Sequence, residues 1–204
     1  MVHESGRLAG DAWPFVGAGL CLALLGLFLP APGGLVSLLG ALVVLVALVL
    51  FRDPTRQVPA LPRAVVSPVD AWVTEISSQP HSEGNLRVIR LRIQPLGAWS
   101  FRSPVEGKVM GLPALEDREG RALWLRTDEG DDVITALIGP RWPKWLAPHP
   151  RAAVGERLAQ GQRFGSRRLA VEARVTLPER SALHVVPGQR VRAGSDSLAE
   201  LVHD

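Results

Sequence analysis

WPFVGAGLCLALLGLFL, from Trp13 to Leu29, and LVSLLGALVVLVALVLF, from Leu35 to Phe51, are two apolar runs without a single charge. At about 1.5 Å per residue in a helix, each run reaches about 25 Å, slightly less than the roughly 30 Å hydrocarbon core of a bilayer. The uncharged turn Pro30–Gly34 separates them. The sequence therefore predicts a transmembrane helical hairpin within residues 1–52, with spans at about 13–29 and 35–51.

A cleaved signal peptide is the alternative interpretation of the first run. Such a peptide has a positively charged flank, which Glu4 and Asp11 offset here, and no small-residue cleavage site precedes a soluble domain. We therefore prefer the hairpin.

The arginines around the two runs predict the orientation of the hairpin. Arg7 precedes the first run and Arg52, Arg56 and Arg63 follow the second, whereas the turn between the runs has no Lys or Arg. Positive residues favour the cytoplasmic side of a membrane. We expect both termini, and the domain after the hairpin, on the cytoplasmic side of a bacterial inner membrane.

Composition limits what the rest of the 204-residue chain can be. After a Pro-rich linker at 53–63, residues 64–204 suffice for one domain with its own core. The net charge of +3 comes mainly from arginine and suits contact with anionic lipid headgroups. The arginines are scattered among strand-like segments, which argues against nucleic acid as a partner. The single cysteine, Cys21, lies in the first run, and no cluster has metal-ligand spacing, so we expect neither disulfides nor a metal site.

Short β-branched or alternating runs dominate the region after the linker. They are bounded by Gly, Pro, Asp and Ser, as strands usually are. This pattern predicts a mostly β domain, a small sheet or barrel-like sandwich, from runs at 65–66, 86–93, 122–126, 133–138, 171–177 and 184–186.

Three short motifs punctuate these runs. Ser67–Val73 and Ser103–Val109 share one template, a Ser-Pro-Val turn that leads into a strand, and Gly188–Gly194 has the spacing of a tight hairpin. We interpret all three as structural turns rather than binding sites. They also resemble the hairpin motifs of biotinyl/lipoyl-like domains in membrane transport adaptors, although no heptads of the usual coiled-coil insertion occur.

Taken in order, five elements resemble the phosphatidylserine decarboxylase family, and most closely its short bacterial membrane-anchored type. Their order and approximate spacing agree from the hairpin to the C-terminus. The elements are Phe51–Pro54, Ser67–Asp70, Pro104–Val109, Gly161–Gly165 and Gly188–Gly194.

The resemblance implies an enzyme that makes its own cofactor. In this family a serine hydroxyl attacks the carbonyl of the preceding glycine, and the resulting ester eliminates to leave a pyruvoyl group at the new N-terminus. The pyruvoyl group then forms a Schiff base with the serine-lipid amine and accepts electrons as carbon dioxide leaves. An aspartate and a histidine assist the self-cleavage.

Two of these processing residues are missing when the family pattern is placed on the chain without gaps. Asp70 occupies the aspartate position, but the histidine position holds Trp99, and an indole has no basic nitrogen to relay a proton. The Gly-Ser cleavage pair, which in the family leads into a strand ending in Pro, falls on Ala170 and Val171. Valine has no hydroxyl, so on this alignment the chain forms no pyruvoyl group and carries no cofactor.

An alternative alignment slides the cleavage pair to Gly165 and Ser166. It needs a deletion before the serine and an insertion after it, and it leaves the histidine to come from elsewhere. Under this alternative, Ser166 would become the pyruvoyl group of an active decarboxylase that makes phosphatidylethanolamine.

A membrane-surface role is suggested by one further segment, in which two indoles alternate with two cations. Arg141, Trp142, Lys144 and Trp145 suit the headgroup layer, although ordinary packing of the two indoles explains the segment equally well. Three functions therefore stay open: a non-catalytic family member that contacts lipid, a phosphatidylserine headgroup or a homo- or hetero-oligomeric partner; an active decarboxylase; and an adaptor module.

Overall fold

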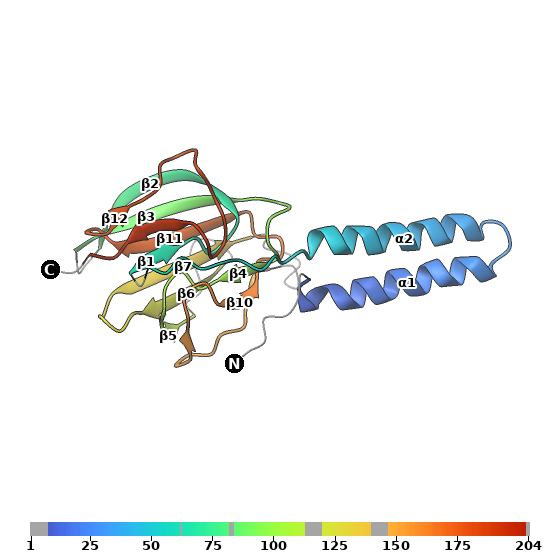
Figure 1. Cartoon of the computed structure of the whole chain (residues 1–204), viewed down its shortest axis with the longest axis horizontal. Coiled ribbons are helices and arrows are strands. Elements are labelled where there is room, and N and C mark those ends of the chain that lie inside the picture. The colour runs from blue at the N-terminus through green and yellow to red at the C-terminus, as the bar shows by residue number, and fades with distance from the viewer. Residues whose placement is uncertain (1–7, 62, 82–83, 113–119, 140–146, 203–204) are drawn as a thin grey trace. The chain divides into compact units, whose positions relative to one another are not determined.

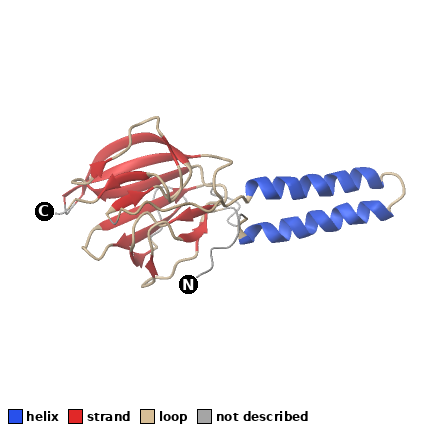
Figure 2. Ribbon diagram, viewed as in Figure 1, coloured by secondary structure: helices blue, strands red, loops and turns tan. Residues whose placement is uncertain are grey.

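The computed structural model of the chain describes residues 8–61, 63–81, 84–112, 120–139 and 147–202. By internal contacts the chain divides into two compact units, Met1–Thr55 and Arg56–Asp204. The first is a pair of helices and the second is built of strands (Figure 2). The prediction of a mostly β domain preceded by a helical hairpin is confirmed.

The first unit contains a short 3-10 helix, η1 (Gly10–Ala12), followed by helices α1 (Trp13–Phe28) and α2 (Gly33–Leu50), which lie side by side (Figure 1). η1 together with α1 (Gly10–Phe28) is long and apolar enough to span a membrane, and so is α2. α2 begins two residues earlier than the apolar run suggested, because its first turn includes the glycines of the connecting segment.

Small residues line the contact between α1 and α2. A side chain at Gly26 or Gly40 would collide with the backbone of the opposite helix, so these glycines permit the close approach. Ser37 Oγ donates a hydrogen bond to Ala23 O at 2.9 Å across the contact. Glycine at the interface and a polar bond between helices are typical of packing in lipid, while Leu and Phe side chains face outward.

The second unit contains an eight-stranded antiparallel sheet and two three-stranded sheets (Figure 1). The strand orders are β13-β2-β3-β11-β7-β6-β5-β9, β1-β14-β12 and β4-β10-β8. The bounds are β1 (Ala64–Val66), β2 (Ala71–His81), β3 (Gly84–Ile93), β4 (Ser100–Arg102), β5 (Gly107–Gly111), β6 (Gly120–Arg126), β7 (Asp132–Ile138), β8 (His149–Pro150), β9 (Arg157–Leu158), β10 (Arg163–Ser166), β11 (Glu172–Pro178), β12 (Ala182–Leu183), β13 (Arg190–Val191) and β14 (Ser197–Glu200).

The unit consists of two equivalent halves. The order of the large sheet reads the same from either edge if β13, β2, β3 and β11 are matched with β9, β5, β6 and β7, and the two small sheets match each other. The Ser-Pro-Val repeats sit at equivalent places and bond reciprocally. Val66 N–H donates to Pro104 O at 2.8 Å, and Arg102 N–H donates to Pro68 O at 2.9 Å. The repeats therefore mark a pseudo-twofold relation.

Each repeat forms the same turn, as the sequence indicated. Ser67 Oγ donates to Val69 O at 2.7 Å, and Ser103 Oγ donates to Val105 O at 2.7 Å. Both hydroxyls are buried, so these bonds satisfy polar groups that would otherwise be costly inside the domain. The serines therefore have a structural role.

Each half also contains a loop bounded by two glycines with positive φ. Gly188 (φ +88°) and Gly194 (φ +68°) donate to Val73 O and Ser67 O, both at 2.7 Å. Their equivalents, Gly155 and Gly161, donate to Val109 O and Ser103 O, both at 2.8 Å. A positive φ favours glycine, so the Gly-x5-Gly spacing in both halves follows from the left-handed backbone at the two ends of each loop.

One strand prediction is wrong. Residues 184–186 are not a strand; the local strand is β12, two residues earlier, and Val185 is buried while its neighbours on both sides are exposed. β12 is an edge strand that pairs only with the end of β14, and beyond Leu183 a single bond continues this pairing, from the His184 N–H to Leu198 O at 2.9 Å. Alternation alone therefore overestimated the pairing here.

Candidate functional site

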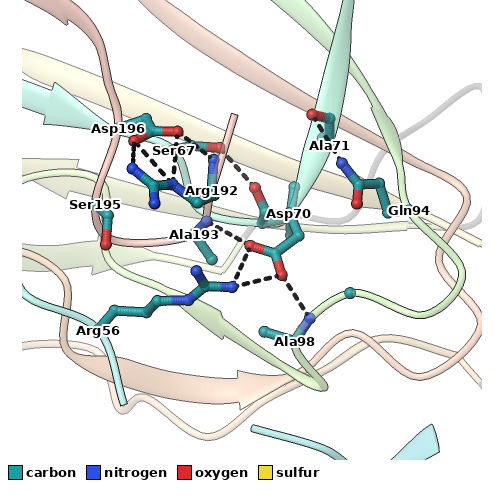
Figure 3. A network of polar contacts seen from close by, with 12 residues as sticks. Arg56, Ser67, Asp70, Ala71, Gln94, Ala98, Arg192, Ala193, Ser195 and Asp196 are labelled. Atoms are coloured by element: carbon teal, nitrogen blue, oxygen red, sulfur yellow. Dashed lines mark hydrogen bonds and ion pairs between the residues drawn. The ribbon is translucent and has the colours of Figure 1, made fainter. Parts of the chain in front are cut away.

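Asp70 follows the first Ser-Pro-Val turn, and its side chain is buried, with the residue 5% exposed. Its Oδ2 accepts a hydrogen bond from the Ala98 N–H at 2.9 Å, and its Oδ1 accepts one from the Ala193 N–H at 2.8 Å. Arg56 Nη2 adds an ion pair to Oδ2 at 3.1 Å (Figure 3). The carboxylate thus joins three segments that are far apart in the sequence.

The loop after β3 is pressed against Asp70. The Gln94 N–H donates to Asp70 O at 2.9 Å, and the Gly97 N–H donates to Gln94 O at 3.1 Å, which closes a turn. A Cβ at Gly97 would lie 2.7 Å from the Cβ of Asp70, so a larger residue would displace the carboxylate. This turn presents the Ala98 amide to Asp70 and leads directly to Trp99.

Arg167 holds the same loop from the other side. Its guanidinium is buried and donates to the carbonyl oxygens of Pro95 at 2.5 Å, Ala98 at 2.8 Å and Gly97 at 3.3 Å. Burial lowers the pKa of Arg167, and the nearby Asp70 carboxylate acts in the opposite direction. The arrangement buries a cation, yet it satisfies backbone oxygens that would otherwise lack donors.

Trp99 occupies the position where the resemblance places a histidine. It is 8% exposed, its carbonyl accepts the Arg167 N–H at 3.0 Å, and the Arg167 guanidinium lies 5.9 Å from the centre of its indole ring. The position is filled by a large packed side chain without a basic nitrogen.

Ala170 and Val171 connect the Arg167 loop to the large sheet. The Ala170 N–H donates to Arg167 O at 2.9 Å and closes a turn, and Val171 bonds to Ile138 O and to the Ile93 N–H, both at 2.9 Å. Ala170 is buried, whereas Val171 is 63% exposed. β11 begins at the next residue, so this pair stands directly before a strand.

Gly165 and Ser166 lie instead at the end of β10, the middle strand of a small sheet. A Cβ at Gly165 would lie 2.5 Å from both His149 O and Phe101 Cε1, so packing accounts for the glycine. Ser166 pairs with Ser100 on one side and His149 on the other. It is 3% exposed, and its Oγ has no hydrogen-bond partner within the part of the chain that the structure describes.

The structure therefore brings most of the expected residues into one region. Trp99 ends the loop at 94–99, and Asp70 bonds to this loop through Ala98. Arg167 also bonds to the loop and begins the turn that leads to Ala170 and Val171. Ser166 is next to Arg167 in the chain but belongs to the small sheet.

The remaining expectations concern other positions. The headgroup candidates Arg141, Trp142, Lys144 and Trp145 lie outside the described residues. His149 is exposed on β8, and His184 Nδ1 lies 2.9 Å from Ser197 Oγ. In the described ranges, no group of three His, Cys, Asp or Glu residues could hold a metal ion.

Sequence reasoning missed Arg56 and Arg167 as parts of this region. Both were counted only as positive charge, and no local pattern distinguishes them from the other arginines. The one available signal was that Arg167 lies between the Gly-x-Arg-Phe-Gly motif and the run at 171–177 that was predicted to be a strand.

Comparison with known proteins gives a consistent set of relatives. No protein-family model matches the chain. The phosphatidylserine decarboxylase proenzyme of Nitrosomonas europaea is 34% identical over 208 residues, which cover 95% of this chain and 94% of that protein. The proenzymes of Symbiobacterium thermophilum (34% identical; 95% of each chain) and Burkholderia ambifaria (32% identical; 95% of this chain and 96% of that protein) match over 210 residues.

Proposed function

Because the chain belongs to the phosphatidylserine decarboxylase proenzyme family, we propose that it is a membrane-anchored member that does not process itself and is not a decarboxylase. Its role is then contact with lipid or with a partner. Without self-cleavage there is no pyruvoyl group, and without that carbonyl the amine of a serine lipid has no electron sink.

The observation that carries this proposal is the place of Val171. The family cleavage pair leads into a strand that ends in proline, and β11 starts directly after Val171 and ends at Pro178. Ser166 ends a different strand, five residues earlier. This supports the alignment without gaps, in which the attacking residue has no hydroxyl.

Two further features support it. Trp99 fills the histidine position and packs under Arg167, so no imidazole is available there to relay a proton. Asp70 bonds to two backbone N–H groups and Arg56, which is the environment of a carboxylate that holds the fold together. The self-cleavage step therefore lacks its imidazole, and the retained Asp70 has a sufficient structural role of its own.

The active alternative, with cleavage at Gly165–Ser166, has one observation in its favour. The Ser166 Oγ is buried without a hydrogen-bond partner among the described residues, and His149 lies directly opposite in β8. Directly opposed residues share a face of the sheet and have Cβ atoms about 5 Å apart. An imidazole at that distance could reach the hydroxyl after a change of rotamer.

Intact mass spectrometry of the detergent-purified chain separates the two. The proenzyme of Nitrosomonas europaea, purified in parallel, is the control for processing conditions, and Ser166→Ala is the matched variant. We expect one species near 22.0 kDa for both wild type and Ser166→Ala. A wild type split into two fragments at Ser166, with an uncut Ser166→Ala, would establish the active alternative.

We place the β domain on the cytoplasmic side of the membrane, on the basis of the arginines that flank the helices. A fluorescent protein that matures only in the cytoplasm, fused after Asp204, should fluoresce in cells. Absence of fluorescence from a membrane-inserted fusion would reverse the orientation.

A further inference from the structure

The loops around Arg167 expose apolar side chains where loops usually present polar ones. Leu96 is 57% exposed, Leu169 48% and Val171 63%. Single exposed apolar residues are common, but here three lie on two loops that are bonded together. Arg167 bonds to the carbonyls on both sides of Leu96, and its own carbonyl closes the turn that contains Leu169.

Cations and an indole adjoin these loops. Arg190 lies 5.9 Å from the centre of the Trp72 ring and donates to Gln94 Oε1 at 3.0 Å, two residues before Leu96. Arg92 is the cross-strand partner of Trp72 and of Glu172, which follows Val171. Trp72 is 46% exposed, and both arginines are exposed.

We infer that these six residues, Trp72, Arg92, Leu96, Leu169, Val171 and Arg190, form a surface that inserts into the headgroup layer of an anionic phospholipid membrane. We call it the loop surface. This inference gives a location to the lipid contact of the proposed function and rests on that proposal.

The chemistry of the loop surface matches a lipid interface. Transfer of leucine and valine side chains from water into the membrane interface is favourable. An indole is stable at headgroup depth, and guanidinium groups bind lipid phosphates. Most of the positive charge of the chain is arginine, which supplies planar donors to phosphate oxygens.

Rigidity and tethering favour the same occupant. Because Arg167 fixes the backbone of the Leu96 loop, insertion costs little conformational entropy. The segment Gly10–Phe28 and helix α2 are each long and apolar enough to span a bilayer, and such a tether raises the effective concentration of the lipid surface. The loop surface can therefore bind the membrane even if its own affinity for lipid is low.

The chain offers a matched pair of positions for the test. Val171 and Val154 are both exposed valines, at 63% and 66%, and only Val171 belongs to the loop surface. In a Cys21→Ala background, Val171→Cys and Val154→Cys would each carry a nitroxide label. The full chains would be placed in nanodiscs of phosphatidylethanolamine and phosphatidylglycerol, and collisions with oxygen and with a water-soluble nickel chelate would be measured.

We expect the label at 171 to collide more with oxygen and less with nickel than the label at 154. Replacing Arg92 and Arg190 by Gln should shift residue 171 back toward water, because each arginine near an anionic surface raises the affinity for the membrane roughly fivefold. Equal nickel access at 171 and 154 would overturn the inference. So would shielding of 171 from both reagents, which would indicate a protein partner.

Failure here is distinguishable from failure of the proposed function. Self-cleavage is read from the intact mass of the wild-type chain, which keeps Val171, and insertion of the loop surface is read from the collision ratio of the labelled variants. An uncut chain with a water-exposed residue 171 overturns only the surface.

Discussion

Asp70 and Glu106 hold equivalent positions in the two halves of the domain, yet only Asp70 is buried. The Asp70 carboxylate accepts hydrogen bonds from two backbone N–H groups and forms an ion pair with Arg56. The Glu106 side chain is 58% exposed and forms an ion pair with Arg157 at 3.1 Å. The same Ser-Pro-Val-acid motif therefore places one carboxylate in a network and the other at the surface.

This difference predicts unequal effects of truncation. Asp70→Ala should lower the free energy of unfolding by about 3 kcal/mol, because two buried N–H groups and a guanidinium lose their acceptor. Glu106→Ala, the matched control, should change it by less than about 1 kcal/mol, since its ion pair is exposed. Urea unfolding of the detergent-solubilised chains measures both, and equal losses would contradict the fold role of Asp70.

Arg167 should be more sensitive than its neighbour Arg168. Arg167→Met leaves the buried carbonyls of the 95–98 loop without donors, so we expect a loss of about 2–3 kcal/mol. Arg168 is partly exposed, and its hydrogen bond to Ala147 O is long, at 3.4 Å. Arg168→Met should therefore lower the free energy of unfolding by less than about 1 kcal/mol. A reversed order in thermal unfolding would show that Arg167 does not organise the loop.

Restoring the cleavage pair alone should not restore processing. The double variant Ala170→Gly, Val171→Ser supplies a hydroxyl, but Trp99 still provides no basic nitrogen. We expect one uncut species by intact mass, and addition of Trp99→His is the informative next step. Fragments from the double variant would show that Trp99 is irrelevant to cleavage.

The glycines at the two ends of the 188–194 segment should respond differently to alanine. Both have positive φ, but a Cβ at Gly188 meets open space, whereas one at Gly194 would lie 2.6 Å from Arg102 Cδ. Arg102 is buried and donates to Gly161 O at 3.1 Å, so it cannot easily move. Gly188→Ala should cost about 1 kcal/mol of backbone strain and Gly194→Ala more than about 2 kcal/mol. Similar melting temperatures would refute the packing argument.

Asp196 should contribute to loss of stability in acid. Burial tends to raise the pKa of Asp196, but hydrogen bonds from the Arg192 side chain and N–H outweigh it, so the pKa is lowered in the folded state. This contribution is complete above the pKa of the unfolded state, about 4, and is lost as the pH falls through the lower pKa of the folded state. Asp196→Asn should flatten the decline of melting temperature below about pH 4. An unchanged decline would exclude Asp196 as a source.

Much of the architecture followed from local patterns. The apolar runs predicted both helices, and the β-branched runs located β1, β3, β6, β7 and β11, because burial in a helix or strand imposes a period on the sequence. The strand expected at 184–186 failed because alternation reports burial on one side, not the presence of a pairing partner. Very short strands such as β9 and β13 have no period to detect.

The candidate site was only partly accessible in the same way. The family resemblance singled out Asp70, Trp99 and Val171 by position, and the structure gathers them around one loop. It did not single out Arg56 or Arg167, since a buried arginine has the same letter as an exposed one. Their roles depend on which carbonyls and carboxylates the fold brings within reach.

By itself, the sequence determined the two apolar helices, the mostly β domain and the glycine turns, since each depends on residues close together in the chain. It also determined the family, through the order of five short motifs along the chain. The tertiary structure alone decided that two similar motifs pair about a pseudo-twofold relation, that Asp70 is buried while Glu106 is not, and that Arg167 supports an exposed apolar loop. The physical reason is that burial and hydrogen-bond satisfaction depend on partners from distant segments, which only the folded chain brings together.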